Sequence, residues 1–249
     1  VPQYLSFINL MAYDYHGSWD AHTGHLAPMY AASDDPFAQT GWSMDETVQT
    51  YLVGYGIPKE KLVLGLPFYG RSWTGVPPGA NGDGLYQSAT GDGPGERDEP
   101  GMLNYHTIIG TYEPAYSKYY HTETKTPWLY NGSNFITYDD PSTISAKAQY
   151  ILQQNLAGAM VWNLMSDVKG NPAPGNSLLR TLWNSLGGVI PVYQCSDGID
   201  NDGDGLVDLA DPGCANAGDD NETDEPPPAT QCSDGVDNDG DGRIDLADP

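Results

Sequence analysis

Three apolar runs of strand length constrain the fold of this chain more than any other feature of its sequence. Each run is almost continuously hydrophobic, which suits a strand that is buried on both faces of a parallel sheet. The runs cover Ser6–Tyr13, Lys61–Phe68 and Gly158–Leu164. Helical patterns over Asp45–Tyr55 and Ser142–Leu156 stand between them. This alternation predicts β-α-β units and therefore an α/β fold.

Aromatic and charged residues follow the first two runs at the point where each strand should end. Residues 14–17 read Asp-Tyr-His-Gly after the first run, and residues 69–71 read Tyr-Gly-Arg after the second. In (β/α)8 barrels the carboxyl ends of the parallel strands carry the functional site. The sequence therefore predicts a site at this edge of the sheet.

Four motifs, taken in order, resemble the family 18 glycoside hydrolases, the chitinases. They resemble the sixth, seventh and eighth barrel strands and the exit from the insertion domain that many members carry. The motifs are Met11–Gly17, Leu64–Arg71, Gly158–Trp162 and Asn134–Pro141. The resemblance covers about residues 3–187 and implies a partial TIM (β/α)8 barrel, the equivalents of strands 6–8, with an α+β insertion over about residues 73–134.

The resemblance implies hydrolysis of β-1,4 bonds in chitin or related N-acetylglucosamine polymers, without a catalytic cofactor. In this family the acetamide oxygen of the substrate itself attacks the anomeric carbon, and the configuration is retained. The catalytic residues carried over by motif are Tyr13, which should hydrogen-bond the acetamide carbonyl, and Asp14, which should steer the acetamide. The sugar-binding residues carried over are Met11, Tyr69, Arg71 and Trp162.

The family's general acid is the last residue of an Asp-x-x-Asp-x-Asp-x-Glu run on the fourth strand, and no such run occurs in this sequence. We expect that strand to precede Val1, so that this chain is the C-terminal part of a longer enzyme and is inactive alone. Two alternatives stay open. One is a chitinase-like lectin in which the acid is replaced, and the other is a calcium-dependent surface or adhesion protein.

The net charge of the chain, −24, is unevenly distributed. Residues 193–249 hold 17 acidic residues and one basic residue, Arg243, so their net charge is −16. Large apolar residues are scarce there, so this stretch needs another source of stability than a hydrophobic core. We place the boundary between a hydrolase-like domain, 1–188, and an acidic tail, 189–249. Such a charge argues against nucleic acid as a partner.

The tail contains a repeat with a period of 37 residues. Residues 195–214 and 232–249 begin with nearly the same eleven residues, and a Pro-rich spacer, 225–230, lies between them. Each copy fits a 12-residue loop with alternating carboxylates and a central glycine, as calcium requires. It resembles thrombospondin type 3 repeats more than an EF-hand. The alternative is a solvated acidic linker. The predicted calcium ligands are Asp200, Asp202, Asp204, Asp208 and Asp211 in the first copy and Asp237, Asp239, Asp241, Asp245 and Asp248 in the second.

Three cysteines accompany the repeats. Cys195 and Cys214 bracket the first loop and are placed to form a disulfide, whereas the repeat puts a partner for Cys232 at position 251, past Pro249. Disulfides and calcium loops are typical of secreted or cell-surface proteins. No apolar run in the sequence is long enough for a membrane span.

Overall fold

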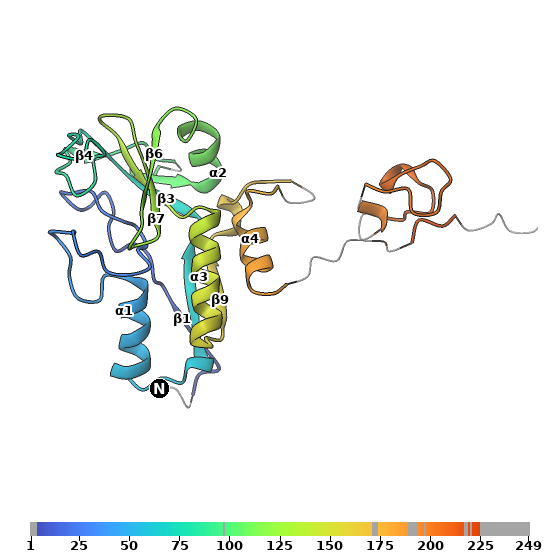
Figure 1. Cartoon of the computed structure of the whole chain (residues 1–249), viewed down its shortest axis with the longest axis horizontal. Helices are drawn as coiled ribbons and strands as arrows, with labels where there is room; N and C mark the ends of the chain where they lie inside the picture. The colour runs from blue at the N-terminus through green and yellow to red at the C-terminus, as the bar shows by residue number, and fades with distance from the viewer. Residues whose placement is uncertain are drawn as a thin grey trace, which may run out of the picture. The chain divides into compact units, whose positions relative to one another are not determined.

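The computed structural model describes residues 4–96, 98–170, 174–188, 194–196, 198–216, 219 and 221–224. The chain divides into two compact units, Val1–Val189 and Ile190–Pro249 (Figure 1). The predicted second repeat, with Cys232, Asp237, Asp239, Asp241, Asp245 and Asp248, and the Pro-rich spacer lie outside the described residues.

The three predicted strands form one parallel sheet in the order β1-β2-β9. Their bounds are Ile8–Leu10 for β1, Leu62–Pro67 for β2 and Gly158–Trp162 for β9. Leu62, Leu64 and Leu66 of the central strand are fully buried, as the apolar run predicts. Strand β1 is shorter than its run, because the Ala12 amide bonds the Leu10 carbonyl and the chain leaves the ladder there. The predicted α/β class is confirmed.

Helices pack beside this sheet, with α3 running along β9 (Figure 1). Helix α3, Pro141–Gln154, begins where the Asp140 carboxylate accepts the Thr143 amide, and it ends at Asn155 in the left-handed region. Helix α1, Met44–Gln49, continues as a π-helical segment, Thr50–Gly54. The remaining helical elements are α2, Tyr105–Thr107, with the π-helical segment Ile108–Tyr112, α4, Leu178–Ser185, and 3₁₀ turns at Lys59–Lys61, Leu164–Ser166, Gln194–Ser196 and Asp208–Ala210.

A second, antiparallel sheet begins directly after β2. Its path is β4-β3-β8-β7-β6, and β5 pairs with β3 beside that path. The bounds are Tyr69–Thr74 for β3, Gly91–Asp92 for β4, Met102–Asn104 for β5, Ser117–His121 for β6, Thr126–Tyr130 for β7 and Phe135–Thr137 for β8. This sheet therefore begins before and ends after the expected insertion at 73–134. Tyr69 and Arg71, expected at a strand end, instead lie within β3.

Hydrogen bonds hold the long loop between β1 and α1 against the second sheet and against the loop that follows β3. The Thr23 hydroxyl donates to the Gly84 carbonyl at 2.7 Å, and the Thr137 hydroxyl accepts the Leu26 amide at 3.2 Å. The Trp73 indole N–H donates to the Asp20 carbonyl. These bonds fix the position of the residues that follow β1 relative to β3.

No helix among the described residues is long and apolar enough to cross a membrane.

Candidate active site

A pocket of about 300 Å³ opens at the carboxyl edge of the parallel sheet. All six residues that the motifs selected line this pocket, although they come from three distant segments of the chain: Met11, Tyr13, Asp14, Tyr69, Arg71 and Trp162. Four further residues complete the lining, Glu99, Met102, Asn163 and Ser166. Strand pairing brings them together, because β1, β2 and β9 end at the same edge and β3 continues from β2.

The charged centre of the pocket is Arg71, whose guanidinium contacts two carboxylates. Its Nε and Nη2 donate to the two oxygens of Asp14 at 3.0 and 3.1 Å. Its Nη1 donates to Glu99 Oε1 at 2.6 Å. The Arg71 side chain is only 10% exposed, and its Cζ lies 4.9 Å from the Trp19 ring centroid. This fork geometry fixes the orientation of Asp14, whose backbone adopts a positive φ of 59°.

Two tyrosines stand beside Asp14. The rings of Tyr13 and Tyr69 meet edge to face, with their centroids 6.1 Å apart. Burial, and then the negative charge of Asp14, raise the pKa of both hydroxyls above the ordinary value for tyrosine. Both phenols therefore stay protonated and can donate hydrogen bonds to a ligand at neutral pH.

The apolar side of the pocket is open. Trp162, at the end of β9, is 58% exposed, and Met11 is 71% exposed, so both present apolar surface to whatever enters. The peptide bond between Trp162 and Asn163 is cis. An exposed indole next to fixed hydrogen-bond donors is a common arrangement where a protein binds a ring with one apolar face.

A chain of side-chain hydrogen bonds forms the back of the site. The Ser166 hydroxyl donates to Asn104 Oδ1 at 2.6 Å, and the Asn104 amide donates to Glu96. Asn104 and Ser166 are buried. These hydrogen bonds connect the turn after β9 with the turn that carries Glu99.

The sequence motifs did not indicate Glu99, Met102, Asn163, Ser166 or Trp19. Glu99 and Met102 lie in the long insertion, where no motif marks them. They reach the pocket because β5 pairs with β3 and Met102 stands opposite Arg71. Asn163 and Ser166 directly follow the third strand motif, so a search extended by four residues beyond Trp162 could have found them.

A family model described as glycosyl hydrolases family 18 matches residues 1–167. The chain belongs to that family. It is 31% identical over 249 residues to chitinase ChiA of Flavobacterium johnsoniae, an alignment that covers 83% of this chain and 16% of that protein.

Solved structures of family 18 proteins have the same fold. Chitinase ChiW from a Paenibacillus species, described as a bacterial cell-surface-expressed multi-modular enzyme, matches with a TM-score of 0.63 and 35% identity, over 77% of this chain and 21% of that one. Human YKL-39, described as a pseudo-chitinase with retained chitooligosaccharide binding properties, matches with a TM-score of 0.67 and 28% identity, over 75% and 52%. This family 18 chain thus spans about half or less of the length of these relatives.

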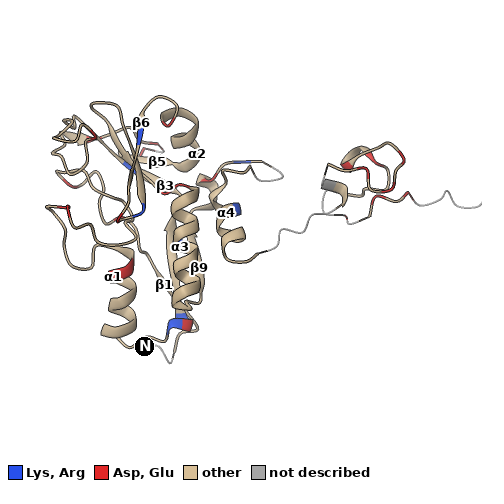
Figure 2. Ribbon diagram, in the orientation of Figure 1, with Lys and Arg blue, Asp and Glu red and all other residues tan. Residues whose placement is uncertain are grey.

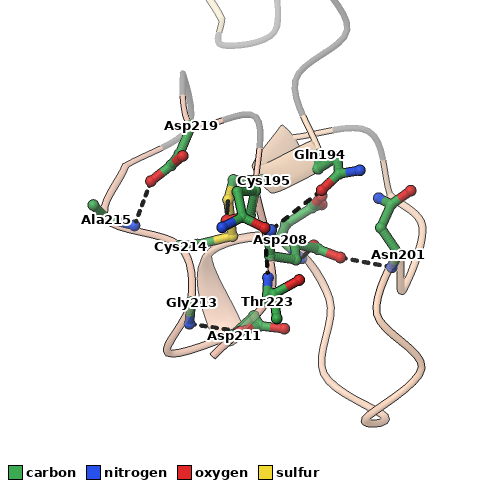
Figure 3. Close-up of a disulfide and its surroundings, with 12 residues drawn as sticks. Gln194, Cys195, Asn201, Asp208, Asp211, Gly213, Cys214, Ala215, Asp219 and Thr223 are labelled. Atoms are coloured by element: carbon green, nitrogen blue, oxygen red, sulfur yellow. Dashed lines mark hydrogen bonds between the residues drawn. A yellow bond between two sulfur atoms is a disulfide. The ribbon is translucent and has the colours of Figure 1, made fainter. Parts of the chain in front are cut away.

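In the second unit, a disulfide joins Cys195 to Cys214, as the sequence predicted (Figure 3). Asp200, Asp202 and Asp204 lie together, with one carboxylate oxygen from each within 4.8 Å of the others. Asp208 and Asp211, predicted as further ligands, lie outside that cluster. Asp208 instead accepts the Gly198 amide, and Asp211 is buried with one oxygen, Oδ2, that has no hydrogen-bond partner among the described residues.

The pKa of Asp211 is raised above the ordinary value for aspartate. The backbone hydrogen bond from Gly213 lowers this pKa, but burial and then the negative charges of Asp204, Asp202 and Asp224 together raise it by more. Glu222, which the loop pattern did not include, is fully buried and accepts the amides of Asn201 and Asp208, both at 2.7 Å.

Proposed function

We propose that this chain supplies the sugar-stacking and acetamide-positioning part of a site that hydrolyses β-1,4 bonds in chitin or related N-acetylglucosamine polymers. The observation that carries the proposal is that six side chains from three motifs line a single pocket. The pocket combines an exposed indole, two protonated phenols and a charged fork, which suits a ring with an apolar face and a polar edge.

Each side chain then has a role in substrate-assisted catalysis. The Trp162 indole would support the apolar face of the sugar, with Met11 beside it. The Tyr13 hydroxyl would donate to the acetamide carbonyl, and Asp14 would accept from the acetamide N–H. These two contacts would hold the acetamide oxygen against the anomeric carbon, where proximity alone lowers the barrier by several kcal/mol.

Arg71 and Tyr69 would complete the polar edge of this site. The guanidinium has N–H groups beyond those it gives to Asp14 and Glu99, and the Tyr69 phenol remains a donor at neutral pH. Both groups would donate to sugar hydroxyls.

The general acid would come from outside these 249 residues, because the sequence has no Asp-x-x-Asp-x-Asp-x-Glu run. We therefore expect the chain by itself to bind N-acetylglucosamine oligosaccharides without cleaving them. Hydrolysis would require a segment that carries the acid.

The test is a titration of the 249-residue chain with chitooligosaccharides by calorimetry, in the parent chain and in two tryptophan variants. Trp162→Ala should weaken binding about tenfold or more, since it removes the stacking surface. Trp183→Ala is the matched control, because Trp183 is 52% exposed on α4 and does not line the pocket. Equal losses in both variants, or no binding by the parent chain, would contradict the proposal.

A carbohydrate-binding lectin is the second candidate, and the similarity to the pseudo-chitinase YKL-39 favours considering it. The two candidates differ at one position, the acid. Sequencing the gene region before Val1 and expressing it with this chain decides between them. Cleavage that is lost on Glu→Gln at the acid supports the hydrolase, and binding without cleavage supports the lectin.

We further propose that the second unit binds calcium through Asp200, Asp202 and Asp204 and that the protein works outside the cell. The three carboxylates offer the hard oxygen ligands that calcium takes, and Asp211 adds a buried oxygen without a hydrogen-bond partner among the described residues. The disulfide suits an oxidising compartment.

Calcium binding is tested by following the amide NMR signals of Gly203 and Gly205 as calcium chloride is added and then removed with EDTA. We expect saturation with a Kd of about 0.1–1 mM, as in extracellular modules. Asp202→Asn should weaken this binding, whereas Asp92→Asn, at an exposed acid of the first unit, should not. Signals that ignore both calcium and EDTA would favour a solvated acidic linker. An adhesion role would be favoured if the full protein held many more such repeats and lacked the other barrel strands.

A further inference from the structure

A second carboxylate, that of Glu99 in the turn before β5, contacts the guanidinium that also binds Asp14. Strand β5 pairs with β3 so that Met102 stands opposite Arg71. Glu99 lies three residues before Met102, in a turn closed by hydrogen bonds from the Glu99 amide to the Glu96 carbonyl and from the Met102 amide to the Glu99 carbonyl. The register of the strands therefore fixes Glu99 beside Arg71.

Asp14 and Glu99 use different edges of the same guanidinium. Asp14 takes the Nε and Nη2 edge and Glu99 takes Nη1, so one positive charge serves two negative charges. The Arg71 side chain is nearly buried, whereas the Glu99 side chain is half-exposed. Water therefore has little access to the guanidinium, and the two carboxylates are its main hydrogen-bond acceptors. The guanidinium therefore has fixed partners on two of its edges, and neither carboxylate holds it alone.

We propose that Glu99 is a positioning residue that acts on Asp14 through Arg71, because its contact to Nη1 holds the guanidinium in the orientation in which Nε and Nη2 reach both oxygens of Asp14. Asp14 is then held in one orientation, in which it can accept a hydrogen bond from a ligand. This inference rests on the proposed function for what Asp14 does, but the link from Glu99 through Arg71 to Asp14 can be measured without any ligand.

The groups that face Asp14 come from three elements. Tyr13 precedes it in the loop after β1, Tyr69 and Arg71 face it from β3, and Glu99 faces Arg71 from the turn before β5. Both tyrosines stay neutral around neutral pH, so the charged side chains described around Asp14 are those of Arg71 and Glu99.

The experiment follows the side-chain Nε–H signal of Arg71 by NMR in the full chain, without ligand, since this N–H donates to Asp14. Glu99→Ala removes the contact to Nη1, so hydrogen exchange of the Arg71 Nε–H should speed up by about tenfold, whereas Glu99→Gln keeps an acceptor and should restore slow exchange. Glu113→Ala is the matched control, because Glu113 also pairs with a base in the insertion but does not line the pocket.

Two further measurements identify the route. In Glu99→Ala the oligosaccharide affinity should fall about fivefold or more. In an Asp14→Asn background the same substitution should change the affinity less than about twofold. An Arg71 Nε–H signal that is unchanged in Glu99→Ala, or an affinity loss of the same size with and without the Asp14 carboxylate, overturns the inference. A chain that shows the Arg71 change but binds no sugar overturns the proposed function instead.

Discussion

The two units of this chain balance their acidic residues in different ways. Among the described residues of the first unit, five carboxylates have a lysine or arginine partner within 3.0 Å: Asp14 and Glu99 with Arg71, Glu113 and Asp140 with Lys118, and Asp139 with Lys147. Residues 190–224 contain no Lys or Arg (Figure 2). Most of the described carboxylates there, such as those of Asp200 and Glu222, accept backbone amides instead. The first unit thus pairs part of its carboxylates with lysine or arginine, whereas the described part of the second unit pairs none of them and leaves their charge for a cation or for solvent.

The largest loss of stability should come from removing the basic partner of a buried carboxylate in the first unit. That carboxylate would then lack a basic side chain nearby, like the described carboxylates of the second unit. Lys147 Nζ lies 2.6 Å from Asp139 Oδ2 and 2.7 Å from the Ala27 carbonyl, and both side chains of the pair are at most 1% exposed. Lys147→Met leaves a buried carboxylate without its base. The free energy of unfolding of the first unit should fall by about 3–5 kcal/mol.

Urea unfolding followed by tryptophan fluorescence measures this loss in the first unit alone, because all six tryptophans lie before residue 188. Adding Asp139→Asn to Lys147→Met should recover a large part of the stability, since no charge then remains buried without a partner. A double variant as unstable as the single one would show that the ion pair is not the cause. Lys118→Met, at a more exposed pair, should cost about 1 kcal/mol.

The sequence predicted the parallel sheet well because burial on both faces leaves a continuous apolar run. It predicted the ends of elements less well. The run Ser6–Tyr13 gives no sign that the chain turns at Ala12, since that turn depends on one backbone hydrogen bond. Likewise the apolar run gives no sign that β3 begins at Tyr69, one residue after β2 ends, because the antiparallel partners of β3 lie at least 17 residues further along the chain.

The residues of the candidate site that stand at strand ends could be predicted from the sequence. Those that the pairing of distant strands brings to the site could not. Tyr13, Asp14 and Trp162 follow or end apolar strands, so a local motif identifies them. Glu99 reaches Arg71 only through the register of β5 on β3. Glu222 similarly contacts two amides that lie 21 and 14 residues before it, outside the 12-residue loop pattern.

A second test addresses the reliance of the tail on backbone amides. Glu222→Ala leaves the Asn201 and Asp208 amides without their acceptor. It should destabilise the second unit by about 1–3 kcal/mol. Hydrogen exchange of these two amides, measured by NMR, should speed up accordingly. Asp224→Asn changes a charge at an exposed residue two positions away and should leave both exchange rates nearly unchanged. If both variants speed exchange equally, net charge and not the specific contact stabilises this unit.

The smallest effect concerns a buried group of the first unit that has no counter-charge. His25 is 2% exposed, and neither ring nitrogen has a hydrogen-bond partner among the described residues. Burial, and then the neighbouring His121 and His16, lower the pKa of its imidazole well below the ordinary value. The neutral ring is therefore the form that the folded unit accommodates, in contrast to the paired ions around it.

His25 should make the first unit less stable as the pH falls. In the unfolded chain the imidazole takes up a proton near pH 6.5, whereas the folded imidazole stays neutral to lower pH, so protons bind preferentially to the unfolded state. The contribution is complete above pH 6.5 and should have fallen by about 1.4 kcal/mol at pH 5.5. Urea unfolding at pH 7.5 and 5.5 should show a smaller loss in His25→Gln than in the parent chain. His106→Gln removes a histidine from a half-buried position and should leave the parent loss unchanged. If the parent and His25→Gln lose equal stability over this range, His25 is charged in the folded unit. Its environment must then supply a carboxylate, as Asp139 does for Lys147 and Asp14 does for Arg71.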